Sequence, residues 1–108
     1  MIRTFLSLDT KPGQRDALIR WYKESGALEK AVEYVGCLST ELYPDGDDEN
    51  RLLVTALWES AEDYDRWVAH PWRQSTTDEI NQYLQEGFSP KSRGSVLESI
   101  HHARLAAR

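Results

Sequence analysis

The segment RLLVTALWE, residues 51–59, is apolar on both of its faces. In an extended chain successive side chains alternate, so Leu53 and Leu57 point to one face. The opposite face carries Leu52, Val54, Ala56 and Trp58. A strand with one solvated face would show polar residues on it. The segment therefore predicts a sheet that is covered by helices on one face and by further protein on the other.

The residues before this strand predict a strand, a helix and a second strand. Residues 2–9 alternate like a strand, and Pro12-Gly13 then marks a turn. From Gln14 to Val35 apolar residues recur at helical spacing. We expect this helix to bend at Gly26 and to end at Gly36. Residues 37–43 follow as a strand, and the polar turn PDGDDEN joins it to residues 51–59 in a hairpin.

The residues after this strand predict helices and a last strand. Ser60 and Asp63 have the spacing of a helix start, so a helix begins at Ala61. Pro71 restarts the chain at a first-turn position, and a further helix begins near Thr76 or Thr77. Gly87 is placed to end that helix. Its buried side carries Ile80, Tyr83, Leu84 and Phe88. Residues 94–102, GSVLESIHH, then form the final strand.

This order is the βαββαβ pattern of a ferredoxin-like α+β fold with a four-stranded antiparallel sheet. The 108 residues are expected to form a single domain, 1–108. Because the open face of the sheet is apolar, we expect a second copy to cover it in a symmetric homodimer.

The composition excludes several classes of function. The net charge of −5 and the absence of a basic stripe argue against a nucleic-acid partner. No segment has the length and apolarity of a signal peptide or a membrane span, so we expect no membrane partner. Cys37 is the single cysteine, which fits a reducing compartment, and we expect a cytoplasmic location. No histidine or carboxylate spacing indicates a metal site.

Three of the four tryptophans gather in residues 58–72, together with Tyr64. Such rings can form a cage for a planar ligand or can serve only as core packing. The residues alone leave both interpretations open. They also leave open whether the loop at 87–94 closes such a pocket.

The chain resembles the antibiotic biosynthesis monooxygenase family of dimeric α+β barrels. The resemblance is carried by the strand GCLSTELY, the turn PDGDDENR and the segment LWESAEDYDRWVAHP, and it covers about residues 2–102. It implies a pocket between sheet and helices in each subunit, and two sheets that form a barrel across the dimer. Several members of the family oxidise phenolic or quinol-like polyketides with O2 and need neither metal nor flavin, so no cofactor is expected.

The resemblance also implies site residues. Trp58 and Tyr64 match catalytic positions of the family and would donate hydrogen bonds. The expected substrate-binding residues are Phe5, Ser7, Val54, Trp67 and Trp72. Val54 stands where family members have an asparagine, and no arginine lies near Thr77 or Asp78, where one would be expected.

The haem-degrading branch of the superfamily shares Trp67, but it needs an asparagine and an iron-ligating histidine. Ser7 and Thr77 occupy those positions, so haem degradation is not expected. The leading hypothesis is a cofactor-independent monooxygenase that acts on a phenolic, hydroquinone or polyketide-like aromatic with O2. The alternatives are a dimeric module that binds such a molecule without turnover, and a cyclase or isomerase on the same barrel.

Overall fold

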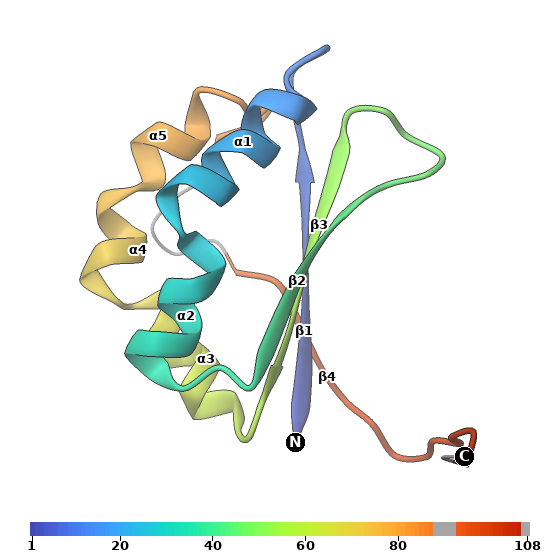
Figure 1. Cartoon of the computed structure of the whole chain (residues 1–108). Coiled ribbons are helices and arrows are strands. Elements are labelled where there is room, and N and C mark those ends of the chain that lie inside the picture. Colours follow the sequence, from blue (N-terminus) through green and yellow to red (C-terminus); the bar gives the residue numbers. More distant parts are fainter. Residues whose placement is uncertain (88–92, 107–108) are drawn as a thin grey trace.

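The computed structural model, which describes residues 1–87 and 93–106, has its helices on one face of a four-stranded antiparallel sheet (Figure 1). The strands lie in the order β2-β3-β1-β4. They are β1 (Ile2–Asp9), β2 (Ser39–Pro44), β3 (Arg51–Trp58) and β4 (Ser95–Glu98). The helices are α1 (Arg15–Ser25), α2 (Ala27–Val35), α3 (Ala61–Val68), α4 (Pro71–Ser75) and α5 (Thr77–Asn81). The predicted ferredoxin-like α+β class is confirmed.

The register between β1 and β3 decides which side chains meet the helices. Thr4 lies opposite Ala56, and Leu8 lies opposite Leu52. Because side chains alternate along a strand, every second residue of both strands points toward the helical layer. Leu8 and Leu52 are almost fully buried there. The predicted assignment of the two faces of residues 51–59 therefore holds.

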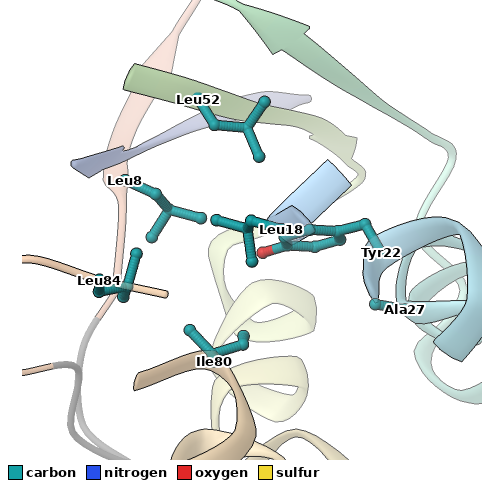
Figure 2. Packing of buried hydrophobic residues seen from close by; sticks show 7 residues of the cluster. All are labelled: Leu8, Leu18, Tyr22, Ala27, Leu52, Ile80 and Leu84. Atoms are coloured by element: carbon teal, nitrogen blue, oxygen red, sulfur yellow. The ribbon is translucent and has the colours of Figure 1, made fainter. Parts of the chain in front are cut away.

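Two clusters of buried side chains fill the space between sheet and helices. The first cluster contains Leu8, Leu18, Tyr22, Ala27, Leu52, Ile80 and Leu84 (Figure 2). Figure 2 shows the side chains from the strands and helices pointing toward one another. The second cluster contains Ala31, Cys37, Ala56, Trp58, Tyr64 and Val68. The free energy of folding comes chiefly from this removal of apolar surface from water.

The expected helix boundaries before Ser75 are confirmed at several residues. Gly26 has φ 70° and separates α1 from α2, so the expected bend is a break between two helices. Gly36 has φ 72° and ends α2, which is the left-handed conformation that favours glycine. Ser60 accepts a hydrogen bond from the Asp63 backbone N–H at 3.4 Å, and α3 begins at Ala61.

The helix expected from Thr77 to Gly87 is wrong in its extent. The helix α5 ends at Asn81, and Leu84 forms a bridge with Thr10 instead. Backbone hydrogen bonds join Lys11 N–H to the Tyr83 carbonyl at 2.8 Å and Gln85 N–H to the Asp9 carbonyl at 2.9 Å. These bonds satisfy the backbone while Leu84 stays buried, so no further helical turn is required. Phe88 lies outside the described residues.

The last strand is also shorter than the expected 94–102. It spans Ser95–Glu98, because Glu98 already pairs with Ile2 at the start of β1. Residues beyond Glu98 run past the end of their neighbour strand and find no further backbone partner in it. His101 and His102 are accordingly exposed.

None of the helices in the described residues lies on the second face of the sheet (Figure 1). Its residues include the partly buried Phe5, Leu53 and Leu57. Tyr43 and Leu97 on the same face are 46% and 54% exposed. In the described part of the chain, no helix has the length and apolarity needed to cross a membrane.

Gly94 provides a test of how closely the chain entering β4 packs against β1. A Cβ added there would lie 2.5 Å from the Phe5 carbonyl oxygen, which belongs to backbone that cannot move aside freely. We expect Gly94→Ala to lower the free energy of unfolding by about 1 to 3 kcal/mol, because overpacking shifts the backbone. Urea unfolding followed by tryptophan fluorescence measures the change. Gly46→Ala is the matched control, since a Cβ there meets nothing within 4 Å. Equal midpoints for the two variants would contradict this account of β4.

Candidate functional site

A cavity of about 60 Å³ lies where the two buried clusters meet, between the sheet and the helices. The sheet side of its lining consists of Thr4, Leu6, Thr40, Val54, Ala56 and Trp58. Opposite them lie Tyr64, Trp67, Trp72, Arg73, Thr76 and Ile80, and residues of α1 and α2 complete the wall. The rings between residues 58 and 72 therefore do not pack into a solid core. They border a space with a mainly apolar wall and a few polar groups.

Trp58 ends β3 and is only 1% exposed. Its indole N–H donates a hydrogen bond to Thr4 Oγ1 at 3.1 Å, which links β3 to β1. Its ring lies 5.4 Å from the ring of Tyr64. Trp58 is expected to donate a hydrogen bond to a ligand. In this structure its only N–H already donates to Thr4, so a ligand would have to compete with Thr4 for it. The Thr4 hydroxyl keeps its own proton for donation.

Tyr64 lies on α3, one turn after the Ser60 cap, and is buried. Its hydroxyl oxygen accepts a hydrogen bond from the Gly94 backbone N–H at 2.7 Å. The Arg93 guanidinium lies over its ring at 5.0 Å. Tyr64 therefore connects α3 to the residues that lead into β4. Residues 88–92, within the stretch 87–94 that was considered as a closure of the pocket, lie outside the described residues.

Trp67 and Trp72 form the helical side of the wall. Their rings are stacked at 5.9 Å, and Trp72 is also stacked on Trp21 of α1 at 6.4 Å. The Lys30 ammonium lies 5.1 Å from the centre of the Trp72 ring. Both Trp67 and Trp72 are only partly buried. This stacked wall borders the cavity and is held by ring contacts rather than by full burial.

Five of the seven site residues expected from the sequence line the cavity, namely Trp58, Tyr64, Val54, Trp67 and Trp72. The other two, Phe5 and Ser7, do not line it within this chain. They alternate with Thr4 and Leu6 along β1 and therefore lie on the open face of the sheet. Thr4 and Leu6 are the residues that β1 contributes instead.

Arg73 is the principal lining residue that the sequence analysis missed. It is only 8% exposed and borders the cavity from α4. A signal was present, because Arg73 precedes the buried Thr76 and Ile80 by three and seven residues, which places them on one side of a helical path. Arginine is mostly found on the solvent side of a helix, so its spacing with Thr76 and Ile80 does not by itself predict that it is buried.

The titratable groups of the described lining are Tyr22, Tyr64 and Arg73. Burial raises the pKa of Tyr22 to about 12, and the charge of Arg73 opposes the rise. Burial lowers the pKa of the Arg73 guanidinium, while Tyr64 and Tyr22 act in the opposite direction. Phenols and guanidiniums are ordinarily protonated at neutral pH. A substrate must therefore release its proton to water or bind as an anion.

The remaining candidate groups lie away from this lining. Cys37 is buried in the second cluster, and burial raises the pKa of its thiol. His70 caps α4, where its Nδ1 accepts from the Trp72 N–H at 3.1 Å. Thr77 is buried outside the lining, and its hydroxyl has no hydrogen-bond partner among the described residues. In that part of the chain no three His, Cys, Asp or Glu residues converge on a possible metal site.

The fold and the cavity together define an α+β domain with an internal pocket between its sheet and its helices. The chain belongs to the antibiotic biosynthesis monooxygenase family, whose model matches residues 1–77. Of the described residues that line the cavity, this match includes all but Ile80. It is shorter than the resemblance over residues 2–102 that the sequence analysis describes.

Solved structures show the same fold at low sequence identity. A proposed antibiotic biosynthesis monooxygenase from Deinococcus radiodurans has 13% identity and a TM-score of 0.76, with 99% of this chain and 100% of that chain covered. A protein from Mycobacterium tuberculosis has 17% identity and a TM-score of 0.73 over 95% and 98% of the two chains. A proposed member from Chloroflexus aurantiacus has 21% identity and a TM-score of 0.62 over 94% and 96%. No curated protein matches the chain.

The bond between Trp58 and Thr4 generates a stability prediction. Thr4→Val keeps the shape of the side chain but leaves the buried indole N–H without an acceptor. We expect it to lower the free energy of unfolding by about 1 to 3 kcal/mol. Trp58→Phe in the Thr4→Val background should cost less than the sum of the two single changes, because both polar partners are then absent. Urea unfolding of the four proteins measures this coupling, and strictly additive costs would contradict it.

Proposed function

We propose that this protein is a monooxygenase that oxidises a phenolic aromatic small molecule with O2, without a metal or flavin. The observation that carries the proposal is the cavity, with its aromatic wall and its few polar groups. Apolar pockets with a small number of placed polar groups are the usual form of small-molecule sites. Membership of the family supports the same class of reaction.

In this reaction the substrate supplies all of the electrons. The ionised phenol gives one electron to O2, and the two radicals join at the ring carbon para to the phenolate oxygen. The resulting peroxide anion takes up one proton, and the hydroperoxide then loses its C–H proton to solvent and expels hydroxide, which leaves a quinone. The hydroxide takes up a proton and becomes water. One oxygen atom enters the product and the other becomes water, so the atoms and electrons balance.

The chain contributes orientation, exclusion of water and hydrogen bonds. The Tyr64 hydroxyl accepts from Gly94 N–H and can donate its own proton to a peroxide oxygen. Thr4 can do the same, because its oxygen accepts from Trp58 and its O–H is a second donor. Trp58 then acts as a positioning residue that fixes the Thr4 hydroxyl. A low-dielectric wall strengthens these bonds relative to water.

The volume of the cavity indicates how a substrate binds. One water needs about 10 to 15 Å³ of cavity, so about 60 Å³ accommodates O2 or a few waters. A substrate ring requires more room and must displace part of the wall. Trp67 and Trp72 are partly buried members of that wall, and their stacked contacts can be exchanged for contacts with a ligand ring. Binding is therefore expected to change the environment of both indoles.

A second candidate function is binding of the same class of aromatic molecule without turnover. The observation that favours it is the engagement of Trp58 by Thr4, which removes one expected donor from the reaction. In this alternative the aromatic wall supplies affinity and O2 plays no part.

Oxygen uptake with anthrone and 1-naphthol tests the two candidates. We expect catalysed uptake, with isotopically labelled O2 delivering one labelled atom into the quinone. Tyr64→Phe should lower kcat/KM by about 100-fold, the typical cost of removing one hydrogen-bond donor to a developing anion. Tyr34→Phe is the matched control, since Tyr34 is exposed and lies outside the cavity lining.

Binding must be measured on the same proteins by quenching of tryptophan fluorescence. Saturable binding without oxygen uptake would exclude the monooxygenase and support the binding module. Equal rates for Tyr64→Phe and the wild type would remove Tyr64 from the mechanism.

We also propose that two copies pair through the open faces of their sheets. The face carries an apolar centre that includes Phe5, Leu53 and Leu97. Arg3 and Glu41 lie on the same face, so a twofold arrangement can bring opposite charges together. Pairing would give Phe5 and Ser7 a place at the interface rather than in the cavity.

The size of the protein in solution tests the pairing. Leu53→Arg introduces a charge at the centre of the open face and should shift a dimer toward monomer in sedimentation experiments. Val32→Arg introduces the same charge on an exposed site of α2 and should leave the dimer intact. A monomeric wild-type protein at micromolar concentration would overturn this proposal.

A further inference from the structure

Arg73 places a positive charge in the wall of the cavity. The residue is 8% exposed and follows Pro71 and Trp72 in the short helix α4. Arginine is rarely buried to this degree in an ordinary core, because its charged form loses hydration there. Arg73 borders the same space as the aromatic wall. Its position therefore suggests a role toward something that binds in that space.

The charges around the cavity make it electropositive. The Arg73 guanidinium acts electrostatically on the phenols of Tyr22 and Tyr64. Arg93 brings a second guanidinium to the ring of Tyr64. The carboxylate that pairs with Arg93 is Asp65, which is 54% exposed and is not part of the lining. Among the described residues that line the cavity there is no Asp or Glu. In a protein of net charge −5 this is a local reversal of sign.

We propose that the cavity binds an aromatic carboxylate, with the carboxylate on Arg73 and the ring against Trp67 and Trp72. The inference rests on the proposed function for the cavity as a ligand site, and it adds the chemical class of the ligand. Arg73 is then a specificity-determining residue, which selects an acid over a neutral molecule of the same shape.

The chemistry of the guanidinium fits this assignment. It presents five N–H donors in a planar fork, so it can keep contacts with the protein and still offer an edge to a ligand. That fork matches the two oxygens of a carboxylate and gives two parallel charge-assisted hydrogen bonds. Although burial lowers the pKa of Arg73, a guanidinium remains charged at neutral pH. A phenol or amide cannot replace both bonds.

The pairing also fixes how the substrate ring is oriented. A carboxylate held at Arg73 fixes the ring in one orientation, and the hydroxyl donors of Tyr64 and Thr4 then meet a defined edge of it. Orientation of this kind is worth more to a reaction than a general gain in affinity, because it acts on the reacting geometry. Selection of the acid and orientation of the phenol would thus come from one side chain.

Binding of two matched probes tests the proposal without any turnover. The probes are 1-hydroxy-2-naphthoate and its neutral analogue 1-hydroxy-2-naphthamide, with Kd measured by quenching of tryptophan fluorescence. We expect the wild type to bind the acid at least about 10-fold more tightly than the amide, as a charge-assisted hydrogen bond predicts. Added salt should narrow this difference only slightly, because the pair is buried.

Substitutions at Arg73 test whether this residue causes the difference in affinity between the acid and the amide. Arg73→Gln should remove the preference for the acid, and Arg73→Lys should keep part of it, because the charge remains but the planar fork is lost. Arg20→Gln is the control, since Arg20 is exposed on α1 and lies outside the lining. Urea unfolding of each variant identifies any that fail to fold. If an Arg73 variant does not fold, the ratio of the wild-type Kd values for the amide and the acid decides whether the cavity selects a carboxylate.

Several outcomes would overturn the inference. These are equal affinities of the wild type for acid and amide, a preference that survives Arg73→Gln, or a parallel loss of both ligands in that variant. Absence of saturable binding of either probe at millimolar concentration would also overturn it. Charge-selective binding without oxygen uptake would leave this inference standing and reject only the monooxygenase. Oxygen uptake with neutral phenols, together with equal affinities for acid and amide, would support the monooxygenase and reject the carboxylate site.

Discussion

The register of β1 against β3 is the constraint on which the site depends. It sends Thr4, Val54 and Trp58 to the helical side of the sheet, where the indole N–H of Trp58 meets the Thr4 hydroxyl at 3.1 Å. A shift of one strand by one residue would turn the side chains of that strand to the opposite face and would leave the buried indole without its acceptor. The hydrogen bond between Trp58 and Thr4 thus stabilises the same β1–β3 register that buries the hydrophobic core. The positions of Thr4 and Trp58 on the sheet side of the cavity follow from it.

Much of the fold was predictable because local signals and tertiary needs agree. The glycines at 26 and 36 adopt the left-handed conformation that ends helices, and Ser60 caps α3 as its spacing with Asp63 suggests. The prediction was wrong after Asn81, where local apolar spacing favours a helix. There the backbone bonds of Tyr83 and Gln85 to the end of β1 satisfy the same groups by another route. Such long-range partners leave no trace in local spacing.

The site was predictable in part. The aromatic residues of the segment from Trp58 to Trp72 line the cavity as the resemblance implies. Phe5 and Ser7 were assigned to it against the alternation of their own strand, which already separates them from Thr4 and Leu6. Arg73 was missed for a different reason, because burial of a charge is a property of the assembled wall rather than of the helix that carries it. The sequence shows which rings gather, whereas the polar groups among them appear only in the folded chain.

The cavity lowers the stability of the folded protein. An apolar void destabilises a protein by about 24 cal/mol per Å³, so a cavity of about 60 Å³ costs on the order of 1 kcal/mol. Ala56 and Ala31 border this space, and a larger apolar side chain at either position would reduce the void. The stacked wall of Trp67 and Trp72 borders the same space with rings that are only partly buried. A wall of this kind can open for a ligand ring at the loss of a few stacking contacts, whereas the strands beneath it cannot move without breaking their register. The proposed function therefore relies on a rigid floor that positions hydroxyl groups and on a wall whose ring contacts a ligand would replace.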